Sequence, residues 1–222
     1  MNQNGDESLI EDQIAYYDRR AAEYDDTMWP QTDPEHEVAE LAQALKRFLP
    51  RGNVLEFACG TGEWTKRLAP YADRILALDS SSEMILRARS KVPDPHVKFE
   101  VVDVFAWRPP ESYDVVFFSF WLSHIPSSRF EDFWRLVDRS LAQNGRVFFM
   151  DEGPHDEFEE KYLADEIVER TLQDGTVHRA VKKYWVPGEL EDTLRKLGWQ
   201  VQVAEAGDSH FFWGSGQKRA MR

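Results

Sequence analysis

Residues 54–62, VLEFACGTG, constrain the fold of this chain more than any other segment. The apolar run is typical of a buried strand, and it leads into a turn that contains Gly60 and Gly62. Asp79 follows Gly62 by seventeen positions (79 minus 62). In a βαβ unit, such glycines let the backbone approach a ligand at the mouth of a parallel sheet, and an acid at the end of the next strand accepts hydrogen bonds from a ribose. The segment therefore predicts a nucleoside-binding βαβ unit.

The same turn lacks the features of a phosphate-binding site. A dinucleotide fingerprint needs a third small residue, so that the next helix can aim its N-terminus at a pyrophosphate, but Thr65 takes that place. Glu63 puts a negative charge where phosphates would lie, and the sequence contains no Gly-Lys-Ser or Gly-Lys-Thr. NAD and FAD are therefore disfavoured, and a nucleoside without phosphates fits better.

Residues 56–62 match the first motif of class I S-adenosylmethionine-dependent methyltransferases, E/D-x-G-x-G-x-G, with Ala58 in place of the first glycine. Residues 76–84, 101–105 and 113–121 resemble this family's later motifs, in the family's order. The resemblance implies S-adenosyl-L-methionine as cofactor and S-adenosyl-L-homocysteine as product, with Asp79 at the ribose and Asp103 at the adenine amino group. Alternatively, each of these two acids is only a helix cap or turn residue. The cofactor-binding residues implied here are Glu56, Ala58, Gly60, Gly62, Asp79, Ser80, Met84, Asp103, Val104, Phe105 and Ser119.

The N-terminal segment carries a further part of the resemblance. Tyr17, Ala21 and Tyr24 are spaced i, i+4 and i+7, so they share one helical face. Residues 16–26 resemble the Y-D-x-x-A-x-x-Y-D opening of small-molecule methyltransferases, with either Tyr16 or Tyr17 as the first tyrosine. This resemblance implies a helix that closes over the cofactor and brings Tyr17 and Tyr24 to its methionine end. Ordinary core packing is the alternative interpretation of such an aromatic stripe.

Strand and helix patterns alternate along the chain, which predicts a doubly wound, mostly parallel α/β sheet in a single domain over residues 1–222. The family resemblance implies seven strands in this Rossmann-like sheet. A helix near 187–197 and strands near 199–206 and 211–216 indicate an antiparallel C-terminal edge. Residues 1–35 form the expected N-terminal cap. The expected strands are 53–58, 74–78, 97–102, 113–119 and 144–150, and the expected helices lie near 36–48, 63–71, 82–91 and 128–141.

Residues 151–186 are an insertion that the minimal fold does not need. The segment opens with an acidic stretch, and Asp174-Gly175 is a strong hairpin signal between two apolar runs. We expect a helix and a hairpin here. In the family such insertions commonly cover the acceptor, so this one is a candidate lid, with a plain edge extension of the sheet as the alternative.

Methyl transfer from a sulfonium needs alignment of the acceptor, exclusion of water and often removal of a proton. His124, just past the fourth strand, is the candidate catalytic base, because an unperturbed histidine titrates near neutral pH. It could instead only bind loop backbone. Asp151 and Glu152 are the next candidates, while His155 and His210 are less well placed and no metal-ligand spacing is visible.

The aromatic residues suggest the acceptor. Several lie in segments expected around the active site, which favours a small aromatic or apolar acceptor, most simply methylated at oxygen. Methylation at nitrogen or carbon, a catalytically silent nucleoside-binding module and a nicotinamide-dependent oxidoreductase remain as alternatives. The candidate substrate-pocket residues are Trp29, Trp121, Glu152, Tyr184, Phe211 and Trp213.

The formal net charge of −13 disfavours nucleic acid and anionic membranes as partners, although solubility alone also explains it. Cys59 is the single cysteine, which excludes an intramolecular disulfide and suggests a reduced, cytoplasmic protein. Neither a leader peptide nor a membrane span is indicated. The sequence leaves open whether the protein is a monomer or a homodimer.

Overall fold

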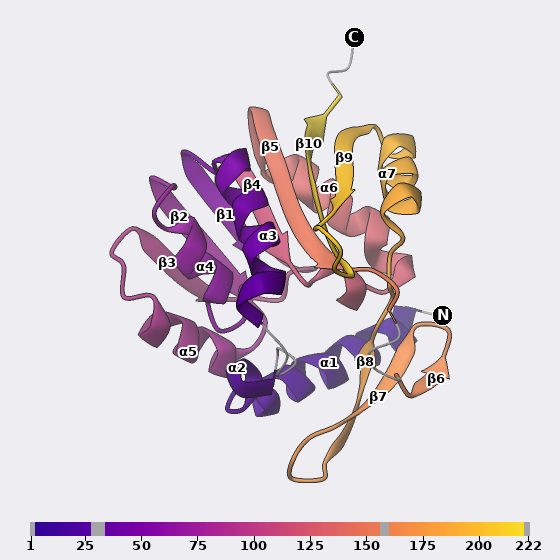
Figure 1. The fold of residues 1–222 in the computed structure, drawn as a ribbon. Helices are drawn as coiled ribbons and strands as arrows, with labels where there is room; N and C mark the ends of the chain where they lie inside the picture. Colours follow the sequence, from indigo (N-terminus) through magenta and orange to yellow (C-terminus); the bar gives the residue numbers. More distant parts are fainter. Residues whose placement is uncertain (1–2, 28–33, 156–159, 220–222) are drawn as a thin grey trace.

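The computed structural model describes residues 3–27, 34–155 and 160–219. Its centre is a seven-stranded sheet in the order β3-β2-β1-β4-β5-β10-β9 (Figure 1). Neighbouring strands from β3 to β5 are parallel, and β10 runs antiparallel to both β5 and β9. The predicted mostly parallel sheet with an antiparallel C-terminal strand is therefore confirmed. The strands are β1 Asn53–Phe57, β2 Arg74–Asp79, β3 Val97–Val101, β4 Tyr113–Ser119, β5 Leu141–Glu152, β9 Trp199–Glu205 and β10 Phe211–Lys218.

Helices cover both faces of this sheet. Buried side chains of α3, α4 and α5 form one hydrophobic cluster with one face, and those of α6 and α7 form a second cluster with the other. Figure 1 shows α3 and α4 in front of the strands and α6 behind them. The helices are α1 Gln3–Arg20, α2 Tyr24–Thr27, α3 Pro34–Phe48, α4 Glu63–Leu68, α5 Ser82–Lys91, α6 Phe130–Ser140 and α7 Pro187–Lys196, with 3-10 turns η1 Leu122–His124 and η2 Ser127–Arg129.

The central strands are apolar on both sides because both faces are covered. In β4 and β5, Phe117 pairs with Phe148 and Phe118 pairs with Phe149. The first pair stacks on the α3 side at 6.2 Å, and the second stacks on the α6 side at 5.4 Å. Successive side chains of a strand point to opposite faces, so these two pairs anchor both cores at the same level of the sheet.

A second, three-stranded sheet is built from the insertion, in the order β6-β7-β8. The Asp174-Gly175 turn joins β7 to β8, so the predicted hairpin is confirmed. The expected helix is wrong for the described part of the insertion, where the acidic stretch instead ends in β6, paired antiparallel with β7. Backbone hydrogen bonds to β7 hold β6 extended, and local acidity does not specify a helix. The strands are β6 Tyr162–Ala164, β7 Ile167–Thr171 and β8 Val177–Val181.

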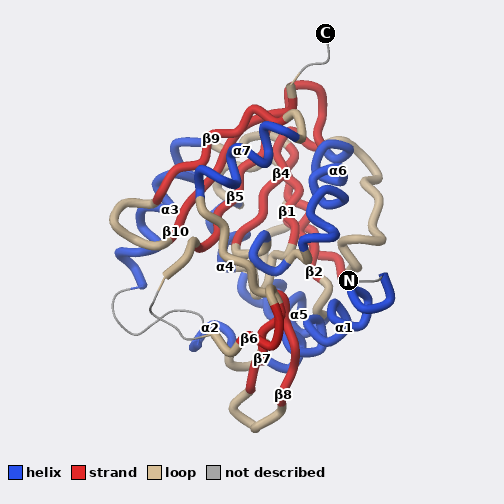
Figure 2. Tube along the Cα trace, turned by 90° about the vertical axis from the view of Figure 1, so that its right-hand side faces the viewer, coloured by secondary structure: helices blue, strands red, loops and turns tan. Residues whose placement is uncertain are grey.

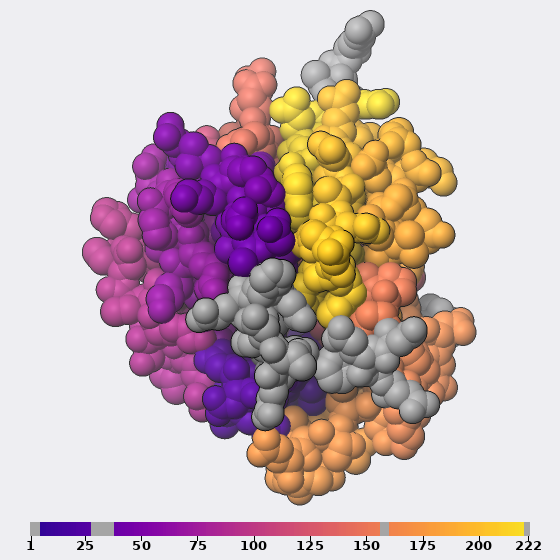
Figure 3. Space-filling model, viewed as in Figure 1, coloured from indigo at the N-terminus to yellow at the C-terminus, as the bar shows by residue number. Residues whose placement is uncertain are grey.

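Helix α1 lies against β8 at the lower end of the molecule (Figure 2). Gln13 accepts a hydrogen bond from the Val181 amide at 2.9 Å and donates to the His124 carbonyl at 3.2 Å. Arg179 donates to Asp12 at 2.7 Å. Figure 3 shows the indigo N-terminal segment beside the orange β-sheet segment at this end. The two segments therefore form one cap, which α1 and β8 hold together. Within the described ranges, no helix combines the length and apolarity that a membrane crossing needs.

Candidate active site

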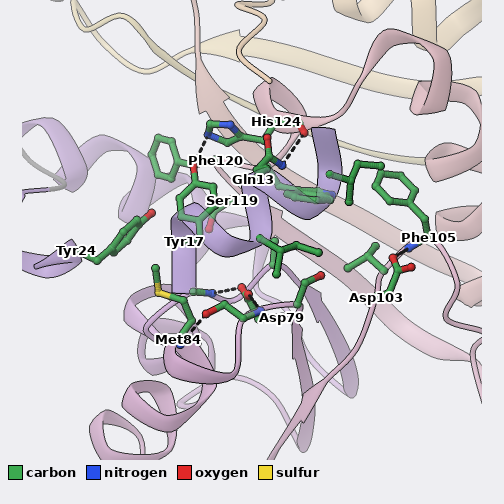
Figure 4. Close-up of a pocket in the computed structure, with 18 residues that line it drawn as sticks. Gln13, Tyr17, Tyr24, Asp79, Met84, Asp103, Phe105, Ser119, Phe120 and His124 are labelled. Atoms are coloured by element: carbon green, nitrogen blue, oxygen red, sulfur yellow. Dashed lines mark hydrogen bonds between the residues drawn. The ribbon is translucent and has the colours of Figure 1, made fainter. Parts of the chain in front are cut away.

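A cavity of about 720 Å³ lies between the carboxyl ends of the sheet strands and α1 (Figure 4). Its position matches the crevice beside β1 and β4, where the strand order reverses, the usual ligand site of an open α/β sheet. The cavity is lined by Ile10, Gln13, Ile14, Tyr17, Tyr24, Ala58, Gly60, Asp79, Ser80, Ser81, Met84, Asp103, Val104, Phe105, Ser119, Phe120, Trp121 and His124.

Asp79 is held at the end of β2 by backbone donors. One carboxylate oxygen accepts from the Gly60 amide at 2.8 Å and the other from the Ser81 amide at 2.9 Å. Burial raises the pKa of Asp79, and these backbone hydrogen bonds oppose the rise. Gly60 has a φ of 53°, and a Cβ there would meet no atom within 4 Å, because the cavity begins at this point. The Asp79 carboxylate, held in a fixed position, and the backbone of Gly60, which carries no side chain, therefore both face the cavity.

Asp103 and Phe105 lie at the other end of the cavity from Tyr24 (Figure 4). The Phe105 amide donates to one Asp103 oxygen at 2.9 Å, which fixes the carboxylate beside the ring. A second carboxylate and an apolar ring, separated from Asp79 along an elongated cavity, suit a nucleoside with one polar end at the sugar and another at the base.

Glu56 and Gly62 are the two expected cofactor residues that do not line the cavity. Glu56 is fully buried and accepts from the Thr65 hydroxyl at 2.7 Å, and burial raises its pKa to about 8. Gly62 has a φ of 83° before α4, and a Cβ there would lie 3.1 Å from the Ala88 Cβ. Both residues therefore support the turn from behind, through packing of α4 and α5.

The cap is fastened to the turn and to α5 by polar contacts. Ser81 caps α5 by accepting from the Met84 amide at 3.1 Å, and its hydroxyl donates to Asp18 of α1 at 2.6 Å. Lys91 donates to Asp25 at 2.7 Å. These contacts hold the N-terminal segment over the cavity.

His124 and Tyr17 form a hydrogen-bonded pair at the inner end of the cavity. The His124 Nδ1 lies 2.8 Å from the Val181 carbonyl, and its Nε2 lies 3.0 Å from the Tyr17 hydroxyl. Burial, aided by the positive charge of Lys182, lowers the pKa of His124 well below its usual value. The ring is therefore neutral, with Nδ1 donating to the carbonyl and Nε2 accepting from Tyr17. Its sequence-based assignment assumed an unperturbed pKa, and that assumption is wrong because the cap buries the ring.

A second hollow adjoins the first and shares Tyr17, Tyr24, Phe120 and His124 with it. Its other walls carry three cationic and two carboxylate side chains. Arg170 binds Glu160 at 2.7 Å, Lys182 pairs with Glu152, and burial lowers the pKa of Lys182 to about 8, opposed by Asp151. The remaining lining residues are Arg20, Thr27, Tyr184, His210 and Phe211.

The expected substrate-pocket residues are divided among several places. Glu152, Tyr184 and Phe211 line the second hollow, while Trp121 lines the first cavity. Trp213 of β10 stacks on Phe148 at 5.9 Å and packs against the core on the α3 side of the sheet. Trp29 lies outside the described residues. The hollow is thus more strongly charged than the expectation of an apolar or aromatic acceptor implies.

Comparison with known proteins places the chain in a family. The family described as "Methyltransferase domain" matches residues 54–145. The structure of a DhpI-SAH complex is 40% identical, with coverage of 96% of this chain and 98% of that chain and a TM-score of 0.84. A DhpI-SAM-HEP complex is 41% identical, with coverage of 93% and 96% and a TM-score of 0.79. The chain belongs to the class I S-adenosylmethionine-dependent methyltransferases.

Shorter matches link this methyltransferase to two curated proteins. It is 34% identical over 68 residues to nodulation protein S of Rhizobium tropici, and these residues are 30% of this chain and 29% of that protein. It is 36% identical over 86 residues to trans-aconitate 2-methyltransferase of Escherichia coli, which are 38% of this chain and 33% of that protein. The matches thus span about a third of either relative.

S-adenosylmethionine is the cofactor of this methyltransferase, and the first cavity fits it. The cavity presents the carboxylates of Asp79 and Asp103, the bare backbone at Gly60 and the tyrosines of the cap. Sequence reasoning missed Gln13 and Ile14, although they lie four and three positions before Tyr17 and so share its helical face. It also missed Arg20, Arg170 and Lys182, for which the sequence carried no motif.

Proposed function

We propose that this methyltransferase transfers the methyl group to an oxygen atom of a small anionic molecule, a carboxylate or a phosphoryl compound. The observation that supports this acceptor class is the set of three cations, Arg20, Arg170 and Lys182, around the hollow that adjoins the cofactor cavity. They outnumber the two carboxylates there, although the whole chain carries a formal net charge of −13.

The energetics of desolvation favour an anion over an apolar acceptor. The Lys182 side chain is only 3% exposed, and Arg170 is 27% exposed. An apolar molecule bound against these charges would displace their remaining water and would offer no hydrogen bonds in its place. A carboxylate or phosphoryl group would replace that water with charge-assisted hydrogen bonds, which arginine can make in bidentate fashion.

An anionic acceptor also accounts for the state of His124. Bound S-adenosylmethionine supplies an activated methyl group, and an anionic oxygen can attack it without losing a proton first. A neutral, buried His124 is therefore no obstacle. We assign it a positioning role, in which Nε2 accepts the Tyr17 proton and so turns the lone pairs of the Tyr17 oxygen toward the junction of the two pockets.

The cap contributes by excluding water. Tyr17 and Tyr24 line both pockets and come from the α1–α2 segment, while Arg170 and Lys182 come from the β7–β8 hairpin and the residue after it. Because Gln13 joins α1 to β8, closure over the cofactor and placement of the acceptor cations are one event. The relative named trans-aconitate 2-methyltransferase, whose substrate by its name is a polycarboxylate, agrees with this acceptor class.

An acceptor panel tests the proposal. The purified protein is incubated with radiolabelled S-adenosylmethionine and with small carboxylates, phosphoryl compounds, phenols and amines of similar size, and labelled products are separated. We expect base-labile methyl esters from the anionic set. Transfer to phenols or amines alone would show that the hollow selects a neutral or cationic acceptor, and the proposal would then fail while family membership would stand.

A further inference from the structure

Two histidines and a glutamate meet at the edge of the second hollow. Glu152 ends β5, His155 follows three residues later, and His210 directly precedes β10. The antiparallel register pairs Glu152 with Phe211, and the Gly153 amide donates to the His210 carbonyl at 2.8 Å. One ligand atom from each of the three side chains lies within 4.8 Å of the other two. The strand pairing itself therefore creates the cluster.

We propose that Glu152, His155 and His210 bind a divalent first-row transition-metal ion of the Zn²⁺, Mn²⁺, Fe²⁺ and Co²⁺ class. Two imidazoles and one carboxylate are a ligand set that such ions use when part of their coordination sphere stays open. Rotation about side-chain torsions would bring these ligand atoms to coordination distance, and all three residues are half-buried.

The surroundings of these three side chains favour an ion site over a simple hydrogen bond between Glu152 and His155. The His155 Nε2 lies 3.2 Å from one Glu152 oxygen, and the His155 and His210 rings are 4.1 Å apart. A carboxylate–histidine hydrogen bond does not need a second imidazole so close, whereas a metal uses both. The His155 side chain is 5% exposed, and the Tyr184 ring packs against it at 5.1 Å, so the ligands are held in a partly desolvated place.

Lys182 limits and orients the site. It pairs with the other Glu152 oxygen, which leaves the oxygen facing His155 for the ion. Its positive charge repels a cation, so we expect weaker binding than at a structural zinc site. A contact from outside the ligand set also fixes the direction of the carboxylate, as is common around metal ligands.

The open coordination positions would face the acceptor. Glu152 and His210 both line the second hollow, and His155 contacts both of them. An ion held there could take one oxygen of an anionic acceptor while Arg170 and Lys182 take the others. This role rests on the proposed function, whereas the metal site itself does not.

Cobalt(II) titration tests the site, because its visible absorption reports coordination directly. Tag-free protein is stripped with a chelator and titrated with Co²⁺ in the absence of any acceptor, and Zn²⁺ is then added as competitor. We expect one Co²⁺ per chain, displaced by Zn²⁺, and at least about tenfold weaker binding in His155→Ala and in His210→Ala. His96→Ala is the matched control, since His96 is exposed and lies away from this cluster.

The outcomes separate the two proposals. Absence of a Co²⁺ spectrum in the wild type, or binding that survives both histidine substitutions, would overturn the metal site. Folding is checked by S-adenosylhomocysteine calorimetry, because neither histidine lines the cofactor cavity, and Glu152→Gln replaces any variant that fails this check. Inorganic phosphate added to the Co²⁺-loaded protein should shift the bands; unshifted bands would remove the acceptor role, and the methyl-acceptor panel tests the proposed function separately.

Discussion

The cofactor cavity and the second hollow, which we propose as the acceptor site and call the acceptor hollow, share a wall at Tyr17 and His124, but their polar groups are held in different ways. In the cofactor cavity, Asp79 and Asp103 accept hydrogen bonds from backbone amides two residues further along the chain. In the acceptor hollow, Lys182 is held by Glu152 from thirty positions away. Local backbone geometry thus fixes the cofactor contacts, whereas side chains from separate segments fix the acceptor contacts. The second arrangement can change its specificity without disturbing the first.

Gly60→Val should produce the largest effect of these substitutions, and this effect should be limited to the cofactor cavity. A Cβ at Gly60 points into the cavity and the φ of 53° disfavours a β-branched residue, so S-adenosylhomocysteine affinity should fall by about a thousandfold or more. Gly175→Val is the matched control, because Gly175 also has a positive φ and no atom within 4 Å of an added Cβ, but it lies in the hairpin turn. Calorimetry measures both, and equal affinities in the two variants would contradict the cavity assignment.

Arg170→Met should affect binding of the acceptor in the acceptor hollow alone. Loss of a charge-assisted contact costs about 1.5–3 kcal/mol, so the acceptor KM should rise by about ten- to a hundredfold while S-adenosylhomocysteine affinity stays the same. Arg135→Met is the control, since Arg135 pairs with Glu131 and Asp132 on the exposed face of α6 and does not line the hollow. A parallel loss of cofactor affinity in Arg170→Met would mean that the two pockets are not separable.

The two pockets also differ in how far the sequence alone revealed them. The turn at Gly60 and the acid at Asp79 could be predicted, because strand, turn and next strand end are consecutive in the chain and need only the local βαβ geometry. Arg170 and Lys182 could not, because the sequence does not specify which face of a hairpin meets the sheet. His124 was singled out by position, but its lowered pKa depends on burial by Tyr17 and by the segment around Val181, which are distant in sequence.

The cluster of Glu152, His155 and His210 illustrates the same limit. Spacing along the chain indicates no metal site there, because the third side chain comes from another strand and arrives through the β5–β10 register. The antiparallel C-terminal edge could be predicted from the sequence, but the register of that strand pair could not. The expected helix in the insertion failed for a related reason, since pairing with β7 decides the conformation of β6.

Glu56→Gln should sharpen the comparison by showing that the support behind the cofactor turn depends on pH. Burial raises the pKa of Glu56 in the folded state from 4.5 to about 8. Between these two pH values the Glu56 carboxyl group is therefore ionised in the unfolded chain but protonated in the folded protein. Its contribution to stability is therefore full below about pH 4.5 and is lost as pH rises toward 8. Relative to wild type, the variant should gain at least about 2 kcal/mol in the free energy of unfolding between pH 5 and pH 8.

Urea unfolding of cofactor-free protein at the two pH values measures this gain. Glu131→Gln, on the exposed face of α6, is the control and should follow the wild type. If Glu56→Gln also follows the wild type at both pH values, then the carboxylate is ionised in the folded state and the turn is not supported by a neutral acid.

The smallest expected effect lies at the shared wall. His124→Gln keeps a side-chain acceptor near the Tyr17 hydroxyl but loses the rigid ring between Tyr17 and Val181, so we expect kcat to fall by about tenfold with cofactor affinity nearly unchanged. Because burial lowers the His124 pKa well below 6.5, the ring stays neutral as pH falls from 8 to 6.5, and the ratio of wild-type to variant kcat should stay constant over that range. Tyr17→Phe should give a similar, pH-independent loss, since it removes the group that His124 positions. A ratio that instead drops as pH falls through 6.5 would mean that His124 titrates at its ordinary pKa and acts as a general base. The methyl acceptor would then still carry its proton when it reaches the wall between the two pockets, and it would not be an anion.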